Sequence, residues 1–306
     1  MKAIITGATG AIGMALIRLL RTHKIEVVAI VRPESSRNSR LKEFSDVTVI
    51  ACSLDRLTNL VNDDRMDEAD FFFHLGWSGT TGDLRDNLEL QLENVRDTLG
   101  AVELAYLTGC KVFVGAGSQA EYGIFHEKLS EETRTVPTTG YGIAKLCAGQ
   151  MSRQACRQRG IRHIWARILS VYGPYDGENS MIISSLRKML QNEPTSFSKA
   201  EQEWDYLYCD DAANALYLSA LKGRNQTTYV VGSGVVRPLQ DYIAVMNRLS
   251  GSTNEPGIGK LPYSEQQAMY LCADINSLQY DTGFYPQVDF EEGIKRTIEW
   301  CRLTGG

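Results

Sequence analysis

Short runs of consecutive apolar residues recur along the first half of this chain. They occupy residues 3–5, 27–31, 47–50, 71–73, 112–114 and 164–166. After the first run, apolar residues fall three or four positions apart at Ile12, Leu16, Leu19 and Leu20, which is helical spacing. A second helical stretch runs from Tyr141 to about Gln158. Continuous apolar runs indicate strands that are buried on both faces, so the alternation predicts a parallel sheet with helices on each side.

The pattern changes after Tyr172. A helix is predicted near 181–191, and a second helix, capped by Asp210 or Asp211, is predicted to run through Leu221. A strand follows at 228–231, Pro238 opens another helix, and a last helix covers about 290–303.

These elements predict an α/β fold, a Rossmann-type doubly wound parallel sheet with a smaller C-terminal substrate-binding lobe. Residues 1–172, joined by 205–232, are expected to form the dinucleotide-binding domain. Residues 173–204 and 233–306 are expected to form the lobe. The chain has no repeats and no long linker, so the lobe should be built on the edge of the sheet.

A glycine-rich turn joins the first strand to the first helix. In this position Gly7 would permit a tight turn, Gly10 the close approach of a ligand, and Gly13 close packing of helix on strand. Backbone N–H groups and the dipole at the start of a helix attract a pyrophosphate. The turn therefore predicts a dinucleotide site made by Gly7, Thr9, Gly10, Ala11, Ile12 and Gly13.

The residue at the end of the second strand indicates whether the ribose of that dinucleotide carries a 2′-hydroxyl or a 2′-phosphate. An acidic residue there would accept hydrogen bonds from the 2′-hydroxyl of NAD. This chain has Arg32 at that place and Arg37 nearby, and a guanidinium suits a 2′-phosphate. NADP(H) is therefore predicted over NAD(H). The alternative is that both arginines are solvated loop charges, which the neighbouring Glu34 leaves open.

Tyr141 and Lys145 are four residues apart, so on a helix they share one face. An ammonium beside a phenol stabilises the phenolate and lowers the pKa of the tyrosine. Such a phenol can exchange a proton with the oxygen of a carbonyl or an alcohol. Ser118 follows the strand at 112–114, where its hydroxyl could hold that oxygen or could simply bond its own turn.

Composition narrows the class of protein. The 306 residues are 43% hydrophobic, which is ample for a core, and the net charge of −5 argues against nucleic-acid and membrane-surface partners. The 7 cysteines are scattered without a C-x-x-C pair, so neither a disulfide framework nor a metal site is expected. No apolar segment suits a signal peptide or a membrane span, and a cytoplasmic location is expected.

Taken in order, these motifs resemble the extended short-chain dehydrogenases/reductases, the family of sugar-nucleotide epimerases, dehydratases and reductases. The resemblance covers nearly the whole chain. It rests on the glycine turn and on His74-Leu75-Gly76, Asn94-Val95, Ser118 with Tyr122-Gly123, Tyr141 with Lys145, Arg167, Val171-Tyr172-Gly173-Pro174, Asp205-Tyr206 and Asp211.

The resemblance implies a role for each of the following residues. Ser118, Tyr141 and Lys145 would be the catalytic set. Ser53, Leu54, Leu75, Gly76, Asn94, Ile168, Leu169 and Val171 would line the cofactor site. The substrate would face Trp77, Glu121, Tyr122, Ser170 and Trp204. A homodimer is possible by the same resemblance.

Departures from the family pattern narrow the reaction. Dehydratases carry an acid–base pair after the catalytic hydroxyl, where this chain has Gln119 and Ala120, so dehydration is not expected. Arg32 argues against an epimerase that holds NAD tightly. Trp204 replaces an arginine that usually grips the substrate diphosphate, although it could stack on a base or sugar. Arg187, Lys188 or Arg237 would then have to supply the charge.

The sequence therefore predicts NADPH-dependent reduction of a keto group on a nucleotide-linked 4-keto-6-deoxy sugar, with Tyr141 as the general acid. The nearest alternative is a sugar-nucleotide 4-epimerase with bound NAD. A reductase of a free small carbonyl compound is a further alternative. A non-catalytic NADP-sensing regulator ranks below these, because it would not need Ser118, Tyr141 and Lys145 together.

Overall fold

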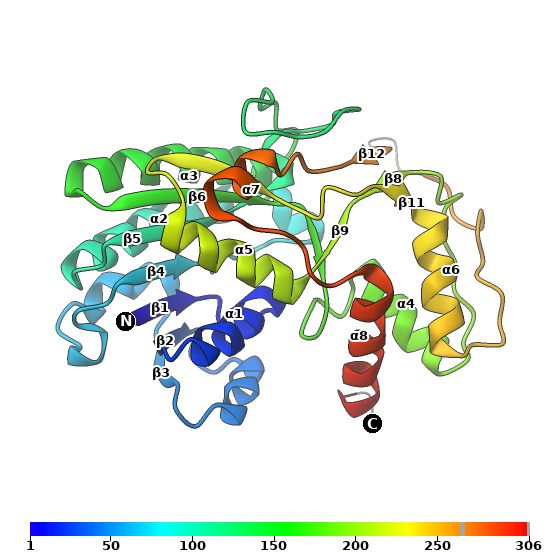
Figure 1. Ribbon diagram of the computed structural model, residues 1–306, viewed down its shortest axis with the longest axis horizontal. Coiled ribbons are helices and arrows are strands. Elements are labelled where there is room, and N and C mark those ends of the chain that lie inside the picture. Colours follow the sequence, from blue (N-terminus) through cyan, green and yellow to red (C-terminus); the bar gives the residue numbers. More distant parts are fainter. Residues whose placement is uncertain (264–266, 305–306) are drawn as a thin grey trace.

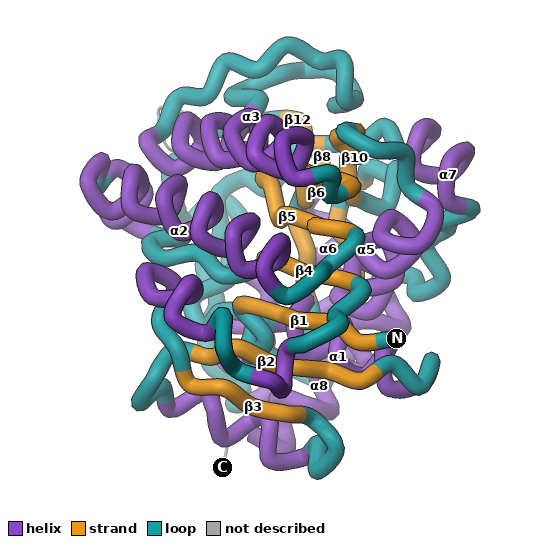
Figure 2. The backbone as a smooth tube through the Cα atoms, turned by 90° about the vertical axis from the view of Figure 1, so that its left-hand side faces the viewer, coloured by secondary structure: helices purple, strands orange, loops and turns teal. Residues whose placement is uncertain are grey.

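A seven-stranded parallel sheet forms the centre of the molecule, in a computed structural model that describes residues 1–263 and 267–304. Its strands lie in the order β10-β6-β5-β4-β1-β2-β3, and Figure 2 shows them stacked one above another. Their bounds are β1 (Lys2–Thr6), β2 (Glu26–Val31), β3 (Thr48–Ala51), β4 (Phe71–His74), β5 (Val112–Ser118), β6 (Arg162–Ile168) and β10 (Thr227–Val231). The predicted doubly wound α/β fold is confirmed.

Both faces of this sheet are buried, as the continuous apolar runs predict. Successive residues of a strand point to opposite faces. Ala3 and Ile5 of β1 join the larger apolar core, whereas Ile4 between them joins a second core on the other face. The strands therefore need apolar residues at every position, and each face requires its own layer of helices.

Helices cover the two faces in pairs (Figures 1 and 2). On one face α1 (Ala11–Thr22) packs against α5 (Cys209–Lys222), and on the other α2 (Leu88–Leu107) packs against α3 (Gly140–Arg159). Short 3₁₀ segments complete the connections, namely η1 (Ser36–Glu43), η2 (Leu54–Leu60), η3 (Asp64–Met66), η4 (Gly82–Asp86) and η5 (Gln119–Glu121). No helix within the described ranges is long and apolar enough to cross a membrane.

The start of α5 differs from the expectation that Asp210 or Asp211 caps it. The N-cap position is Tyr208, and no side chain caps the helix. Asp211 lies within the first turn, where its carboxylate instead accepts hydrogen bonds from the backbone N–H groups of Gln287 and Val288 at 2.9 Å each. The acidic side chain thus ties the helix to a distant segment.

Apart from α7, the remaining helices and strands gather beyond the carboxyl ends of the strands (Figure 1). Three helices pack together there, α4 (Met181–Leu190), α6 (Leu239–Ser250) and α8 (Phe290–Thr304), while α7 (Asn276–Thr282) packs against α5. A small sheet has the order β11-β8-β12, and a parallel pair joins β7 to β9. Their bounds are β7 (Ser170–Tyr172), β8 (Glu203–Trp204), β9 (Tyr206–Tyr208), β11 (Arg237–Pro238) and β12 (Tyr270–Leu271). The division into domains stays a prediction.

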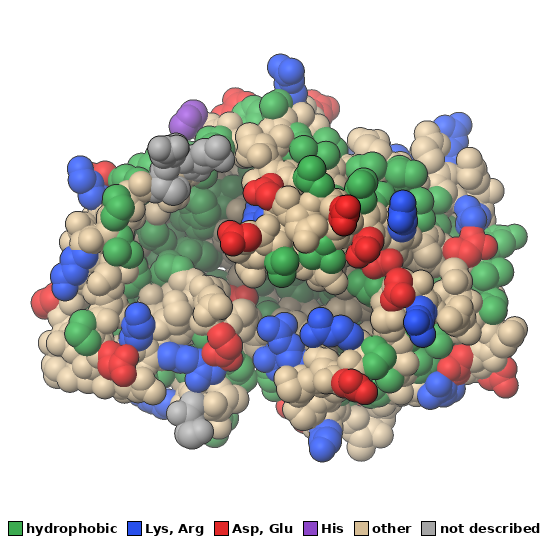
Figure 3. Space-filling view, turned by 180° about the vertical axis from the view of Figure 1, so that it is seen from behind, with side chains coloured by type: hydrophobic (Ala, Val, Ile, Leu, Met, Phe, Trp, Pro, Cys, Tyr) green, Lys and Arg blue, Asp and Glu red, His purple; other side chains and the backbone are tan. Residues whose placement is uncertain are grey.

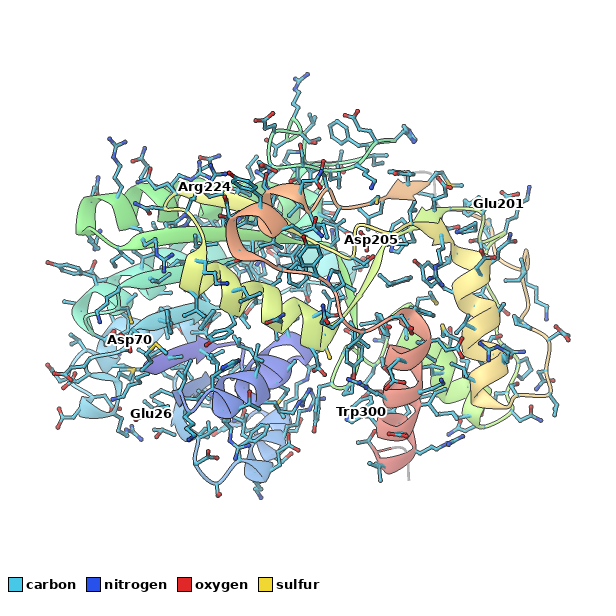
Figure 4. The ribbon with its side chains drawn as sticks, in the orientation of Figure 1. Glu26, Asp70, Glu201, Asp205, Arg224 and Trp300 are labelled. Atoms are coloured by element: carbon cyan, nitrogen blue, oxygen red, sulfur yellow. The ribbon has the colours of Figure 1, made fainter. Side chains whose placement is uncertain are left out.

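Asp205 connects these elements to the large sheet (labelled in Figure 4). Its fully buried carboxylate accepts hydrogen bonds from Ser233 N and Oγ, Gly234 N and Ala273 N, at 2.6 to 3.0 Å. One side chain therefore fixes the loop after β10 and the segment after β12 at the same point.

Candidate active site

The glycine turn after β1 has the geometry that phosphate binding requires. Gly7 has φ of +71°, and a Cβ there would lie 2.6 Å from the carbonyl carbon of Leu75. A Cβ at Gly13 would lie 2.5 Å from the Gly7 carbonyl oxygen. At Gly10, the N-cap residue of α1, a Cβ would come no closer than 3.7 Å to other protein atoms. Gly7 and Gly13 are thus required by the fold, while Gly10 leaves space for a ligand.

A buried histidine fixes the backbone opposite this turn. His74 ends β4, and its Nδ1 lies 2.9 Å from the Thr6 hydroxyl, which also accepts a hydrogen bond from Gly76 N at 3.1 Å. Its Nε2 lies 3.3 Å from the hydroxyl of Thr98. Burial lowers the pKa of His74 to about 3, with a smaller effect of the Lys145 charge, so the ring is neutral. It therefore acts as a spacer between β1, β4 and α2.

A cavity of about 820 Å³ opens beside the turn and extends along the ends of β2 and β3. This volume is within the range of small-molecule sites. Its wall includes nine of the predicted cofactor residues, Gly7, Thr9, Gly10, Arg32, Arg37, Ser53, Leu54, Leu75 and Gly76. Arg32 and Arg37 are exposed, and neither forms an ion pair with another described residue. Asn38 also lines the cavity and donates from Nδ2 to the Arg32 carbonyl at 3.0 Å.

A second cavity of about 800 Å³ shares Gly7, Gly10, Leu75, Trp77 and Thr80 with the first, so the two adjoin. Figure 3 shows that the back of the molecule is hollowed, with hydrophobic side chains inside the hollow. The wall of this second cavity contains Ala11, Ile12, Gly13, Ser118, Tyr141, Lys145, Ile168, Leu169, Ser170 and Val171, all of them predicted site residues. Side chains from β5, α3 and β7 therefore converge on one space next to the glycine turn.

Ser118 is held in this wall by a buried ion pair. It is the last residue of β5, and its backbone N–H donates to Glu121 Oε1 at 2.8 Å. The same carboxylate accepts from Trp165 Nε1 at 2.9 Å and from Arg167 Nε at 2.7 Å. A charge with this many partners can be buried, because the hydrogen bonds replace those lost to water.

The structure places Glu121 and Tyr122, which were predicted to face a substrate, away from both cavity walls. Both side chains are 0% exposed. Glu121 is committed to the ion pair, and the Tyr122 hydroxyl donates to the Ser130 carbonyl at 2.7 Å. Motif spacing could not reveal this, because η5 turns the chain inward directly after Ser118.

Tyr141 and Lys145 lie in the first two turns of α3 but are not in direct polar contact. Lys145 Nζ donates to the Ala116 carbonyl at 2.7 Å and lies 3.7 Å from the centre of the Trp77 ring. Its distance to the centre of the Tyr141 ring is 5.8 Å. Burial lowers the pKa of Lys145 to about 7, and the charge of Glu121 opposes this shift.

The pKa of Tyr141 also differs from the sequence-based expectation. Burial raises it above the usual value, while hydrogen bonding with Ser118 and the charge of Arg85 lower it. The expected lowering by Lys145 is not among the effects on this phenol. The ammonium is turned towards Ala116 and Trp77 instead.

Two further predicted residues contact the site only through neighbours. Asn94, predicted to line the cofactor site, is 1% exposed and does not belong to either cavity wall. Its side-chain amide bonds the backbone of Ser78 at 2.8 and 2.9 Å. Trp204 donates from Nε1 to the Ser170 hydroxyl at 2.8 Å and so lies behind the cavity wall.

Sequence reasoning missed two charged residues in the second cavity, Arg85 and Asp176. Arg85 belongs to η4, in a polar stretch without periodicity, and its guanidinium carbon lies 4.6 Å from the centre of the Tyr141 ring. Asp176 accepts a hydrogen bond from Gly177 N at 2.7 Å, and burial raises the pKa of its carboxyl. Its position two residues after the Val171–Pro174 motif was the available signal.

The loop that carries Arg85 is organised by one buried amide. Gln91 on α2 is 1% exposed, and its Oε1 accepts from Trp77 Nε1 at 2.9 Å. Its Nε2 donates to the carbonyls of Gly79 and Leu84 at 2.9 and 2.8 Å. Residues 77–84 therefore fold around a single side chain.

Comparisons with known proteins agree with this geometry. A relative named CDP-abequose synthase, from Salmonella typhimurium, is 27% identical over 97% of this chain and 97% of its own length. The crystal structure of UDP-glucose 4-epimerase from Thermotoga maritima, solved with UDP-glucose, has a TM-score of 0.88 at 22% identity and covers 100% of both chains. UDP-glucuronic acid 4-epimerase from Bacillus cereus, in complex with UDP-glucuronic acid and NAD, has a TM-score of 0.84 at 20% identity and covers 99% of this chain and 100% of its own.

The sequence model of one family matches residues 3–232, which is most of the chain and includes the glycine turn, Ser118, Tyr141 and Lys145. The resemblance to extended short-chain dehydrogenases/reductases is thereby confirmed. This protein belongs to the NAD dependent epimerase/dehydratase family.

Proposed function

We propose that this protein is an NADPH-dependent reductase that acts on the keto group of a nucleotide-linked 4-keto-6-deoxy sugar. The observation that carries the proposal is the second cavity, whose wall contains both the glycine turn and Ser118, Tyr141 and Lys145. Gln119 and Ala120 follow Ser118 in the wall or beside it, and neither side chain can transfer a proton at neutral pH. These two positions therefore do not supply the paired acid and base that dehydration requires, whereas Tyr141 can donate a proton for reduction.

The preference for NADP(H) rests on the first cavity. The space left by Gly10 fits a pyrophosphate at the start of α1. Arg32 and Arg37 border the cavity at the end of β2, where an acid would be expected for NAD. A guanidinium gives a 2′-phosphate charge-assisted hydrogen bonds.

The chemistry assigned to the protein is proton transfer and positioning. A bound nicotinamide would supply the hydride. Ser118, fixed by Glu121, would hold the substrate oxygen, and Tyr141 would give its proton to that oxygen as negative charge develops. Lys145 would bind the cofactor ribose from its place on the next turn of α3.

Two lines of support favour a nucleotide-linked sugar as the substrate: an arginine that could bind its diphosphate, and the ligands named for similar proteins. Arg237 of β11 pairs directly with Trp204 of β8, and opposed residues of an antiparallel pair share one face. Arg237 is exposed, and we propose it as the cation for the substrate diphosphate, whereas Arg187 is paired with Glu178 at 2.9 Å. The relative named CDP-abequose synthase and the neighbours solved with UDP-glucose or UDP-glucuronic acid support a nucleotide-linked sugar.

The test is a panel of nucleotide-linked 4-keto-6-deoxy sugars, with the absorbance of NADPH as the readout. Turnover of at least one sugar, and its loss in Tyr141→Phe, is expected. Turnover of a free ketone but of no sugar nucleotide would contradict the substrate class. Purified protein that carries NAD and interconverts UDP-sugars without net consumption of cofactor would establish the 4-epimerase alternative instead.

The cofactor assignment has its own test. Arg32→Asp should lower the preference for NADPH over NADH, measured as the ratio of kcat/KM values. An unchanged ratio would show that Arg32 does not contact the 2′-phosphate.

A further inference from the structure

The guanidinium of Arg85 lies close to the ring of Tyr141, the residue that donates a proton in the proposed reaction. Its guanidinium carbon is 4.6 Å from the centre of the Tyr141 ring, whereas Lys145 Nζ is 5.8 Å from that centre and bonds the Ala116 carbonyl. Both distances are within reach of cation–π attraction, but Lys145 Nζ is also held by a carbonyl at 2.7 Å. Among the described residues, the Arg85 side chain makes one hydrogen bond, a long one of 3.4 Å to the Thr80 carbonyl.

The position of Arg85 is fixed from two sides. The neighbouring Asp86 accepts a hydrogen bond at 2.7 Å from the backbone N–H of Gly140, the first residue of α3. Gln91 holds the Leu84 carbonyl at 2.8 Å on the other side. η4 is therefore clamped between α2 and the turn of α3 that carries Tyr141. A Cβ at Gly140 would lie 3.1 Å from the Arg85 carbonyl oxygen, which shows how closely the two segments pack.

We propose that Arg85 is a positioning residue for proton transfer, which holds a permanent positive charge over the Tyr141 ring and stabilises the phenolate formed when the proton leaves. The inference rests on the proposed role of Tyr141. In that step the O–H bond of Tyr141 breaks, its proton passes to the substrate oxygen, and the electron pair stays on the phenol oxygen. The ring then carries a negative charge, and a facing cation attracts it more strongly than the neutral ring.

Groups from several elements affect the pKa of Tyr141. The hydrogen bond with Ser118 of β5 and the charge of Arg85 of η4 lower it, and the charge of Glu121 of η5 raises it. Lys145 lies on the same helix, and its own pKa of about 7 leaves it partly neutral near neutral pH. An arginine is always charged in this range, so Arg85 is the constant cation at this phenol.

The experiment uses the full chain labelled with ¹³Cζ-tyrosine, and it needs no substrate. The chain has 14 tyrosines, and Tyr141 is assigned by the signal that Tyr141→Phe removes. The phenol is titrated by NMR up to the alkaline limit of the fold, which circular dichroism defines. Arg85→Met should move the titration midpoint of Tyr141 to higher pH by about one pH unit, or about tenfold in phenolate at fixed pH. Arg85→Lys should keep the midpoint near that of the natural chain.

The clamp is tested through Asp86. Asp86→Asn keeps an acceptor for Gly140 N–H and should leave the Tyr141 midpoint close to the natural one, whereas Asp86→Ala should raise it as Arg85→Met does. The same midpoint in the natural chain and Arg85→Met would overturn the proposal. A Tyr141 that stays protonated to the alkaline limit in the natural chain as well would also overturn it. Because no turnover is measured, either result is distinguishable from failure of the proposed reaction.

Discussion

Replacing Glu121 with glutamine removes the charge from a side chain that is 0% exposed. The carboxylate accepts hydrogen bonds from Ser118 N, Trp165 Nε1 and Arg167 Nε at 2.8, 2.9 and 2.7 Å. The glutamine has nearly the same shape, but its NH₂ group is a donor facing other donors. The guanidinium of Arg167, whose side chain is only 7% exposed, would lose its counter-charge.

The expected loss follows from this burial. Breaking a buried ion pair by removing one partner costs about 3–5 kcal/mol, because the other charge is left without solvent or partner. Glu121→Gln should therefore lower the free energy of unfolding by roughly 3 kcal/mol or more. This is a large share of the stability of an ordinary domain, about 5–15 kcal/mol.

Urea unfolding followed by circular dichroism measures the change as a shift of the midpoint at constant slope. The matched control is Glu291→Gln, which breaks the pair with Arg248 at 2.7 Å on side chains that are 44% and 59% exposed. Exposed pairs contribute about 0–1 kcal/mol, so this control should be nearly neutral. If Glu121→Gln cost no more than Glu291→Gln, the account of Ser118 as fixed by a buried ion pair would be refuted. Adding Arg167→Met to Glu121→Gln should recover part of the loss, since no unpaired charge remains.

Two further predictions concern the glycine turn and the buried lysine. Gly7→Ala should destabilise the fold, because its Cβ would lie 2.6 Å from Leu75 and its φ is positive. Gly10→Ala should have the stability of the natural chain but should bind NADPH at least about tenfold more weakly, as measured by fluorescence titration. Equal thermal stability of the two variants would contradict this. Burial lowers the pKa of Lys145 from 10.5 to about 7, so between these values the unfolded chain binds a proton that the folded chain does not. The stability of the natural chain relative to Lys145→Met should therefore rise as pH increases through this window, and urea midpoints that differ by the same amount at pH 6 and pH 9 would contradict it.

Much of the fold could be predicted because a parallel sheet leaves a simple pattern. A strand buried on both faces must be apolar throughout, and the runs at 27–31 and 112–114 correspond to β2 and β5. The glycine turn and the spacing of Tyr141 and Lys145 likewise predict residues that line the same cavity. The two-residue strands β8, β11 and β12 could not be predicted, since so short a pairing has no periodicity.

Two predicted site residues lie away from the cavity walls for the same physical cause. Glu121 and Asn94 are polar residues within the motifs, and their side chains make hydrogen bonds with the protein's own backbone. Sequence spacing reports on distance along the chain and does not show which way a 3₁₀ turn directs a carboxylate. Arg85 was missed for the opposite reason, because an isolated arginine in a polar loop looks like an ordinary solvated charge until α3 is seen beneath it.

The role of Gln91 has a consequence for ligand binding. Its side-chain amide makes hydrogen bonds with Trp77 Nε1 and with the carbonyls of Gly79 and Leu84. Residues 77–84 therefore lose their conformational entropy when the protein folds. A ligand that enters the second cavity then meets a wall that is already ordered, and its affinity is not reduced by the free energy of arranging that wall. Preorganisation of this kind makes the segment a poor gate. It also couples Trp77 and η4, so an opening of either would have to break hydrogen bonds to the same side chain.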